Sequence, residues 1–179
     1  GNHEGDIEYA KRLVRDAADA GVDAVKFQSY SANGLVSQIE DPERHKHFDR
    51  FSLAFEQYIE LSDLANQNGL MFMSSVWDSN FLIALDPYIS IHKIGSGDLT
   101  NLPLIKEIVN CGKPLIISTA MATMEEVKKT VDFIDKISPN FVEMGNLAVL
   151  HCVAMYGKPK DKHANLKVLQ TFINELPNV

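Results

Sequence analysis

Apolar residues recur at helical spacing in several segments of the chain, and a glycine follows most of them. In the first segment, about residues 6–20, Ile7, Ala10 and Val14 lie three or four positions apart. Gly21 suits the left-handed residue that ends a helix. Further helices are predicted at about 56–68, 81–85 and 103–111, onward from a capping box at 123–126, and at about 164–176.

The second of these helices, about residues 56–68, has a recognisable inward stripe. We expect Ile59, Leu64 and Ala65 to face the core, and Gly69 to end the helix.

Short apolar runs separate the helices and predict strands. They lie at 23–28, 70–75, 91–95, 115–119 and 147–152. Strands that alternate with helices form a parallel sheet with right-handed crossovers. The runs are nearly all apolar, which is typical of strands covered on both faces.

The alternation favours a barrel over a dinucleotide-binding sheet, because no Gly-x-Gly-x-x-Gly follows any predicted strand. A whole TIM-type (β/α)8 barrel usually takes roughly 250 residues. We therefore expect an α/β fold in which residues 1–179 form a single, partial barrel domain. It would hold about strands 2 to 6 of the barrel with their helices, and lack the first strand and the last two units.

Residues 29–52 interrupt the alternation. They show neither helical nor strand periodicity, and we expect a long loop with a functional role or high mobility. His45 and His47 lie in a charged run of this segment, so a solvated loop is favoured there over a metal site.

Composition narrows the function classes. The chain is 45% hydrophobic and 23% charged, and its formal net charge of −7 argues against nucleic acid as a partner. No apolar run approaches the roughly 18 residues that cross a bilayer, so we expect no membrane association. Cys111 and Cys152 form no disulfide framework, which makes a cytoplasmic location the default expectation.

Polar residues end each predicted strand. Lys26 and Gln28 share one face of the first strand because side chains alternate along a strand. The other strand ends bring Ser74, Ser75, Trp77, Asp78, Lys93, Ser96, Asp98, Ser118, Thr119, His151, Cys152 and Tyr156. The carboxyl ends of barrel strands meet at one rim, where active sites lie. Two lysines and several hydroxyls there suit a phosphate and a carboxylate, as an aldol-type condensation needs to align its reactants.

Several of these side chains also have a structural interpretation. A lone strand-end lysine is commonly a solvated rim residue, although Lys93 in the position of Lys26 strengthens a functional role for both. His151 is either an inward ligand or a hydrogen-bonded core histidine. Cys152 is interpreted as a small buried residue rather than a nucleophile. Trp77 either covers a sugar face or packs the rim.

Five motifs, in register over nearly the whole chain, resemble the sialic acid synthase family. They are Gly1-Asn2-His3-Glu4-Gly5, Asp23-Ala24-Val25-Lys26-Phe27-Gln28, His92-Lys93-Ile94-Gly95-Ser96-Gly97-Asp98, Gly112-Lys113-Pro114 through Ser118-Thr119-Ala120-Met121, and Leu150-His151-Cys152 through Tyr156. Each motif alone is weakly specific, and the five together are a strong resemblance.

The resemblance implies a reaction. Phosphoenolpyruvate condenses with an N-acylated amino sugar, N-acetylmannosamine or a relative, to give a sialic acid-type nonulosonate and phosphate. It also implies a divalent metal, manganese or magnesium, and a homodimer. Its metal ligands would lie beyond Val179, and the family's C-terminal antifreeze-like domain is absent from this sequence.

The resemblance also implies roles for individual residues. Lys26 and the catalytic Lys93 would bind the phosphoenolpyruvate carboxylate and phosphate. Asp98 would be the catalytic acidic residue that handles the sugar and a proton. The remaining substrate-binding residues would be Ser75 and Ser96 as hydrogen-bond partners, Gln28 and Tyr156 as sugar-orienting groups, and Asn2 and His3 of the first motif.

Three positions depart from the family pattern: Ala120, Ala154 and Gly157 replace glycine, asparagine and proline respectively. With these departures and without the metal ligands, we expect this 179-residue chain to be inactive alone, although its intact parent would be an enzyme. Two alternatives remain open. One is a barrel aldolase or lyase that forms a Schiff base on Lys26 or Lys93. The other is a non-catalytic sugar-binding barrel.

Overall fold

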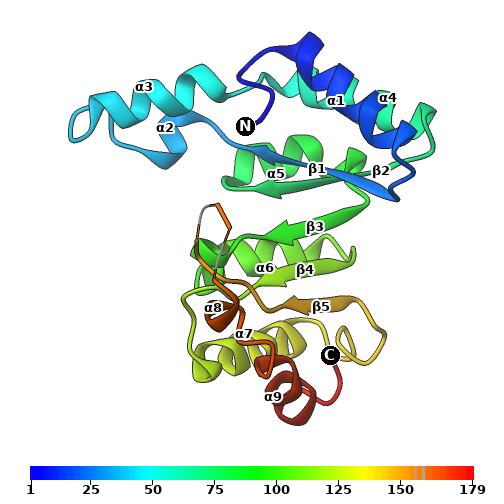
Figure 1. Cartoon of the computed structure of the whole chain (residues 1–179), viewed down its shortest axis with the longest axis vertical. Coiled ribbons are helices and arrows are strands. Elements are labelled where there is room, and N and C mark those ends of the chain that lie inside the picture. The colour runs from blue at the N-terminus through cyan, green and yellow to red at the C-terminus, as the bar shows by residue number, and fades with distance from the viewer. Residues whose placement is uncertain (156, 159) are drawn as a thin grey trace. The chain divides into compact units, whose positions relative to one another are not determined.

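The computed structural model describes residues 1–155, 157–158 and 160–179. The strands form a parallel sheet in the order β1-β2-β3-β4-β5, with helices between them, as the alternating pattern predicts (Figure 1). The chain divides into two compact units, residues 1–92 and 93–179, and the boundary falls within β3 (Ile91–Ile94).

Unit 1 holds two parallel strand pairs. It contains α1 (Ile7–Asp19), β1 (Ala24–Ser29), α2 (Ala32–Leu35), α3 (Pro42–Phe51), α4 (Phe55–Gln67), β2 (Met71–Val76), α5 (Ser79–Leu85) and a 3-10 turn, η1 (Asp86–Tyr88). The strand β1 pairs with β2 from Ala24 opposite Met71 to Ser29 opposite Val76. The start of β3 pairs with β2 as well.

Helices α1 and α4 cover one face of β1 and β2 (Figure 1). The buried Phe27 and Phe72 of these strands stack with their ring centroids 5.7 Å apart. The inward stripe of α4 differs from the expected one. Tyr58, Leu61, Ser62 and Ala65 are its buried residues, while Ile59 and Leu64 are only half-buried. Ala65 is buried as expected, whereas Tyr58, Leu61 and Ser62 are buried in addition.

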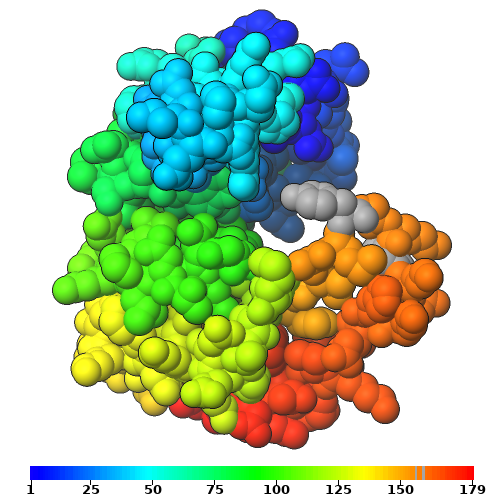
Figure 2. Space-filling model, turned by 90° about the vertical axis from the view of Figure 1, so that its left-hand side faces the viewer, coloured from blue at the N-terminus to red at the C-terminus, as the bar shows by residue number. Residues whose placement is uncertain are grey.

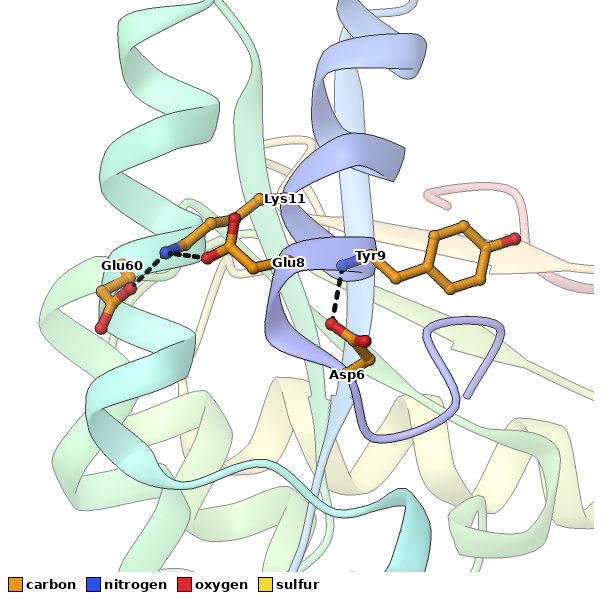
Figure 3. A network of polar contacts seen from close by, with 5 residues as sticks. All are labelled: Asp6, Glu8, Tyr9, Lys11 and Glu60. Carbon is orange, nitrogen blue, oxygen red and sulfur yellow. Dashed lines mark hydrogen bonds and ion pairs between the residues drawn. The ribbon is translucent and has the colours of Figure 1, made fainter.

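Polar contacts fix the start of α1 and tie it to α4 (Figure 3). Asp6 caps the helix by accepting a hydrogen bond from the Tyr9 amide at 3.0 Å. Lys11 donates to Glu60 of α4 at 2.8 Å and to Glu8 at 3.0 Å. These hydrogen bonds, that of Glu60 first, raise the pKa of Lys11.

The segment 29–52 is not a structureless loop, and that expectation was wrong. It contains the short helix α2 and the ten-residue helix α3. Asp41 caps α3 by accepting from the Arg44 amide at 3.0 Å, and Pro42 occupies its first turn. None of the α3 residues is fully buried. The sequence accordingly shows no apolar stripe for this helix, and its local signals are at its ends: Asp41-Pro42 and Glu43 at the start and Arg50 in the last turn.

Unit 2 repeats the strand-helix pattern. After the end of β3 come η2 (Ser96–Asp98), α6 (Leu102–Asn110), β4 (Leu115–Ser118), α7 (Met124–Ile137), β5 (Leu147–Leu150), α8 (Asp161–Ala164) and α9 (Val168–Glu175). The strands β4 and β5 are parallel, with Leu115 opposite Leu147 and Ser118 opposite Leu150. Helices α6 and α7 supply buried core residues, among them Ile105, Ile108, Val127 and Ile134.

The helix expected at about 164–176 is present as α9 and begins four residues later, at Val168, while the short α8 precedes it. Asn165 adopts a left-handed conformation, with φ of 42°, and ends α8. Leu166 and Ile173, which the periodic pattern includes, are 68% and 65% exposed. An ion pair between Lys128 of α7 and Glu175 holds α9 to the rest of unit 2, and Figure 2 shows α9 (red) at its surface. No helix in the described ranges has the length and apolar character that a membrane span needs.

Candidate functional site

A hollow of about 460 Å³ lies along β1 in unit 1. Four residues named in the sequence analysis line it: Asn2, His3, Lys26 and Gln28. Tyr30 follows β1 and lines it too. The hollow therefore combines a cation, an imidazole and two amides, which suits a small anionic or hydroxylated ligand.

Lys26 and Gln28 lie on the same face of β1, since strand side chains alternate. Lys26 is exposed to solvent. The surrounding protein nevertheless lowers the pKa of its ammonium through desolvation.

The loop before α1 holds His3 in place. The Gly5 amide donates a hydrogen bond to Nδ1 of His3 at 3.2 Å, and the Asp6 amide donates to the His3 carbonyl oxygen at 2.8 Å. His3 is 5% exposed, and its ring lies 6.0 Å from the Phe27 ring. Two effects lower the pKa of His3. The larger is desolvation by burial, and the smaller is the positive charge of the amino terminus.

Tyr58 of α4 holds the backbone near the end of β1. Its hydroxyl donates to the carbonyl oxygen of Gln28 at 2.7 Å, and its ring is fully buried. Desolvation, followed by the proximity of Tyr30, raises the pKa of Tyr58. Sequence analysis did not identify this residue. Its helical spacing with Leu61 and Ala65 was the available signal, but periodicity does not reveal which carbonyl a hydroxyl reaches.

Ser75 lies in β2, and Trp77 directly follows this strand. Ser75 is buried and stands opposite Gln28 in the strand register. The indole of Trp77 stacks on Tyr30, with ring centroids 5.2 Å apart and 22° between the planes. Tyr30 also meets Phe48 of α3 edge-on at 5.5 Å. Trp77 thus packs within unit 1, the structural one of the two roles considered for it.

In unit 2, Lys93 is 8% exposed and well hydrogen-bonded. Its ammonium donates to Ser118 Oγ and to the Ile94 carbonyl oxygen, each at 2.5 Å. The buried charge is therefore held by a hydroxyl from β4 and by its own strand.

Ser96 and Asp98 lie in η2, directly after β3. Ser96 Oγ accepts a hydrogen bond from the Ala120 amide at 3.0 Å. Desolvation raises the pKa of Asp98, against the opposing effect of a hydrogen bond with Asn101. A carboxyl with a raised pKa is suited to take up and release a proton. Tyr156, the remaining sequence-predicted residue, lies outside the described residues.

His151 and Cys152 line a second hollow in unit 2, of about 300 Å³. His151 Nε2 donates to the Ala164 carbonyl oxygen at 2.8 Å, which accounts for it as a hydrogen-bonded histidine. Cys152 is half-buried rather than buried as expected, because the chain leaves the sheet after Leu150.

The side chains that could bind a metal ion were compared within each unit separately. The pair closest to a ligand set in unit 1 is Asp86 and the buried His92, whose Oδ1 and Nε2 atoms lie 2.9 Å apart. Among the described residues, neither unit alone brings three histidine, cysteine, aspartate or glutamate ligand atoms together. The divalent metal that the sequence resemblance implies stays a prediction, with its ligands expected beyond Val179.

The NeuB family model matches residues 13–179. The N,N'-diacetyllegionaminic acid synthase of Legionella pneumophila is 35% identical, over 97% of this chain and 52% of that protein. The N-acetylneuraminate-9-phosphate synthase of Mus musculus is 30% identical, over 99% of this chain and 51% of that protein. The chain thus spans about half the length of these curated relatives.

The fold is similar to solved structures of such synthases. The N-acetylneuraminic acid synthetase of Leptospira borgpetersenii, crystallised with citrate, aligns with a TM-score of 0.87 at 26% identity. The alignment covers 97% of this chain and 58% of that one. An incomplete, barrel-like α/β fold is thereby confirmed.

Proposed function

Because the chain belongs to the NeuB family, we propose that it takes part in the condensation of phosphoenolpyruvate with an N-acylated amino sugar, giving a sialic acid-type nonulosonate and phosphate. The observation that carries this proposal is that Asn2, His3, Lys26 and Gln28 line one hollow. The names of the relatives, which are synthases of legionaminic and neuraminic acids, support the class of product.

On the resemblance alone, Lys26 and Lys93 are each assigned to the three-carbon donor. Phosphoenolpyruvate carries a phosphate and a carboxylate, and each attracts an ammonium group. Lys93 is pre-positioned by Ser118, so its charge needs little reorganisation on binding. Lys26 is more exposed and lines the hollow. Ser75 and Ser96 add hydrogen bonds.

The reaction forms one carbon-carbon bond. Carbon 3 of the enol attacks the aldehyde carbon of the sugar, and the aldehyde oxygen takes up a proton to become a hydroxyl. Water then adds at carbon 2 and loses its proton. Phosphate leaves with cleavage of its bond to carbon 2, which leaves a ketone. The site must hold the two carbons close and aligned.

Asp98 handles a proton in this scheme. Its raised pKa lets the carboxyl accept a proton from the attacking water or donate one to the sugar oxygen. Gln28 orients the sugar, with its backbone fixed by Tyr58. Tyr156 is assigned the same role on the resemblance alone. A divalent metal would polarise the sugar aldehyde when bound.

The test is phosphate release from phosphoenolpyruvate with a panel of N-acylated amino sugars. It is run with the full-length gene product and with residues 1–179. We expect release by the former and little by the latter. Lys26→Met should lower kcat/KM for phosphoenolpyruvate by about 10- to 100-fold, the effect of losing a hydrogen bond to a charged group. Lys129→Met, which alters an exposed lysine of α7, is the matched control and should change it less than about twofold. A full-length product that releases no phosphate with any sugar would refute the proposal.

The lowered pKa of Lys26 also favours a second function, a Schiff-base aldolase, because a neutral amine is the nucleophile in that chemistry. Borohydride treatment in the presence of pyruvate separates the two. The synthase predicts no covalent adduct, whereas a reduced adduct on Lys26 would establish the aldolase.

A further inference from the structure

Two asparagines of this chain are followed directly by glycine, in Asn33-Gly34 and Asn68-Gly69. A glycine leaves the backbone nitrogen after the asparagine unshielded, because it has no Cβ. That nitrogen can attack the side-chain amide carbon of the asparagine and close a five-membered ring. The two sites share the same pair of residues, so a difference in their reactivity reflects the fold around them.

A histidine from the next helix contacts the Asn33 side chain. His45 of α3 has its Nε2 atom 2.8 Å from Oδ1 of Asn33. A side-chain carbonyl oxygen only accepts hydrogen bonds, so Nε2 carries the proton and donates it. When the Gly34 nitrogen adds to the amide carbon, negative charge develops on this same oxygen. A donor that is already in place there stabilises that charge.

The backbone around Asn33 belongs to a single helical turn. The helix α2 has four residues, and both Asn33 and Gly34 are exposed. The Gly34 amide donates to the Oγ and to the carbonyl oxygen of Ser31, each at 3.1 Å. A turn this short opens at small cost. Rotation about the Cα–C bond of Asn33 then frees the Gly34 nitrogen and does not itself move the side chain away from His45.

Asn68 is held differently. Its Nδ2 atom donates to the Leu64 carbonyl oxygen at 2.7 Å, which turns the side chain back along α4. The Gly69 amide donates to the Asn66 carbonyl oxygen at 3.0 Å. The helix α4 has 13 residues and packs on β2. The same reaction at Asn68 therefore requires the end of a longer, packed helix to open.

We propose that Asn33-Gly34 is a site of spontaneous modification, with His45 as the hydrogen-bond donor that promotes it. The Gly34 nitrogen bonds to the amide carbon of Asn33 and loses its proton to water. The bond from that carbon to Nδ2 breaks, and Nδ2 takes up a proton and leaves as ammonia. Water then opens the succinimide ring at either carbonyl, which gives aspartate or isoaspartate. The sequence of steps needs no oxidant, reductant or cofactor.

The modification changes the joint between α2 and α3. A neutral acceptor beside His45 becomes a carboxylate, which forms an ion pair when the imidazole is protonated. An isoaspartate also adds one methylene to the backbone of α2. This helix follows closely on Tyr30, which lines the hollow along β1. The product therefore differs from the unmodified chain in the segment that continues from the hollow.

The first measurement uses the unmodified chain, incubated at neutral pH. Peptide mapping by mass spectrometry follows the conversion of amide to acid at Asn33 and at Asn68, and electron-transfer fragmentation separates aspartate from isoaspartate. We expect Asn33 to convert about tenfold faster than Asn68, since its turn opens more easily and its oxyanion has a donor. In unfolding concentrations of urea the two rates should approach each other, because the fold no longer distinguishes the sites.

Substitution of the histidine isolates its contribution. His45→Phe keeps a ring in place but removes the donor, and it should slow conversion at Asn33 by about 3- to 10-fold. The rate at Asn68 in the same molecule should not change. His45→Gln restores a side-chain N–H and should recover part of the rate at Asn33. His47→Phe, at an exposed histidine of the same helix, is the matched control and should leave both rates unchanged.

Three results would overturn the inference: a rate at Asn33 no higher than at Asn68 in the folded chain, a ratio of the two rates that persists in urea, or an Asn33 rate that His45→Phe leaves unchanged or raises. Circular dichroism checks that the variants fold. If His45→Phe does not fold, the rates of the unmodified chain with and without urea decide the question. The outcome is independent of the proposed function, because no substrate takes part.

Discussion

At the scale of single residues, Gly5 shows how local backbone geometry serves the hollow. Its φ of 80° lies in the left-handed region, and a Cβ there would come within 2.1 Å of the Arg50 carbonyl oxygen. The residue must therefore be glycine for two reasons, conformation and space. The sequence shows that a glycine follows the Asn-His pair, but the close approach of Arg50 depends on α3, which the sequence pattern does not reveal.

We expect Gly5→Ala to destabilise the protein more than a positive φ alone explains. Gly69→Ala is the matched control, since Gly69 has a φ of 75° and open space around its missing Cβ. The control should cost about 1–2 kcal/mol of unfolding free energy. Gly5→Ala should cost about 3 kcal/mol or more, because overpacking adds to the conformational term. Urea unfolding of both variants provides the comparison, and equal losses would contradict the close approach of Arg50 to Gly5.

At the scale of elements, helix starts were the most predictable features and helix faces less so. The capping box at Thr123 was predicted from the sequence, and the structure contains it. Thr123 accepts from the Glu126 amide at 3.3 Å, and Glu126 accepts from the Thr123 amide at 2.7 Å. In contrast, α3 was missed because it buries no residue completely. Capping depends on residues three positions apart, whereas burial depends on what the fold brings against a helix.

Loss of the Thr123 cap should weaken α7 and reduce the acid sensitivity of the fold. Thr123→Ala is expected to cost about 1 kcal/mol at pH 7. The Thr123 amide and then its hydroxyl lower the pKa of Glu126 below its ordinary value of 4.5. The associated stability is thus present above about pH 4.5 and is lost as the pH falls through the lowered value.

Thermal unfolding of Thr123→Ala between pH 7 and pH 3 measures both effects. The difference in stability from the unmodified chain should narrow as Glu126 becomes protonated. Glu125→Gln alters a neighbouring carboxylate in the same helical turn and is the control. A pH-independent difference would mean that the hydroxyl does not act through Glu126.

At the scale of the whole molecule, the division into two units runs through a strand. The strand β3 begins in unit 1, where Ile91 and His92 pair with β2, and ends in unit 2 with Lys93 and Ile94. Neither unit can lose its part of this strand without disturbing the backbone of the other. That residues 1–179 form a single domain, as the sequence pattern predicts, stays a prediction.

We accordingly expect a single cooperative unfolding transition. Trp77, the one tryptophan of the sequence, lies in unit 1 and reports that unit through its fluorescence. Far-ultraviolet circular dichroism reports the helices of both units. The two urea midpoints should coincide within error, as they do for a two-state protein. A fluorescence transition well separated from the circular dichroism transition would instead mean that the units unfold independently.

The sequence by itself determined the order of strands and helices, the parallel sheet and the placement of polar residues at strand ends. These features follow from local periodicity and capping, which act over a few residues. Tertiary structure decided which face of α4 is buried and that Tyr58 donates to the Gln28 carbonyl. It also gathered Asn2, His3, Lys26 and Gln28 around one hollow. Such contacts join positions more than twenty residues apart, and their partners are set by packing geometry that no local pattern encodes.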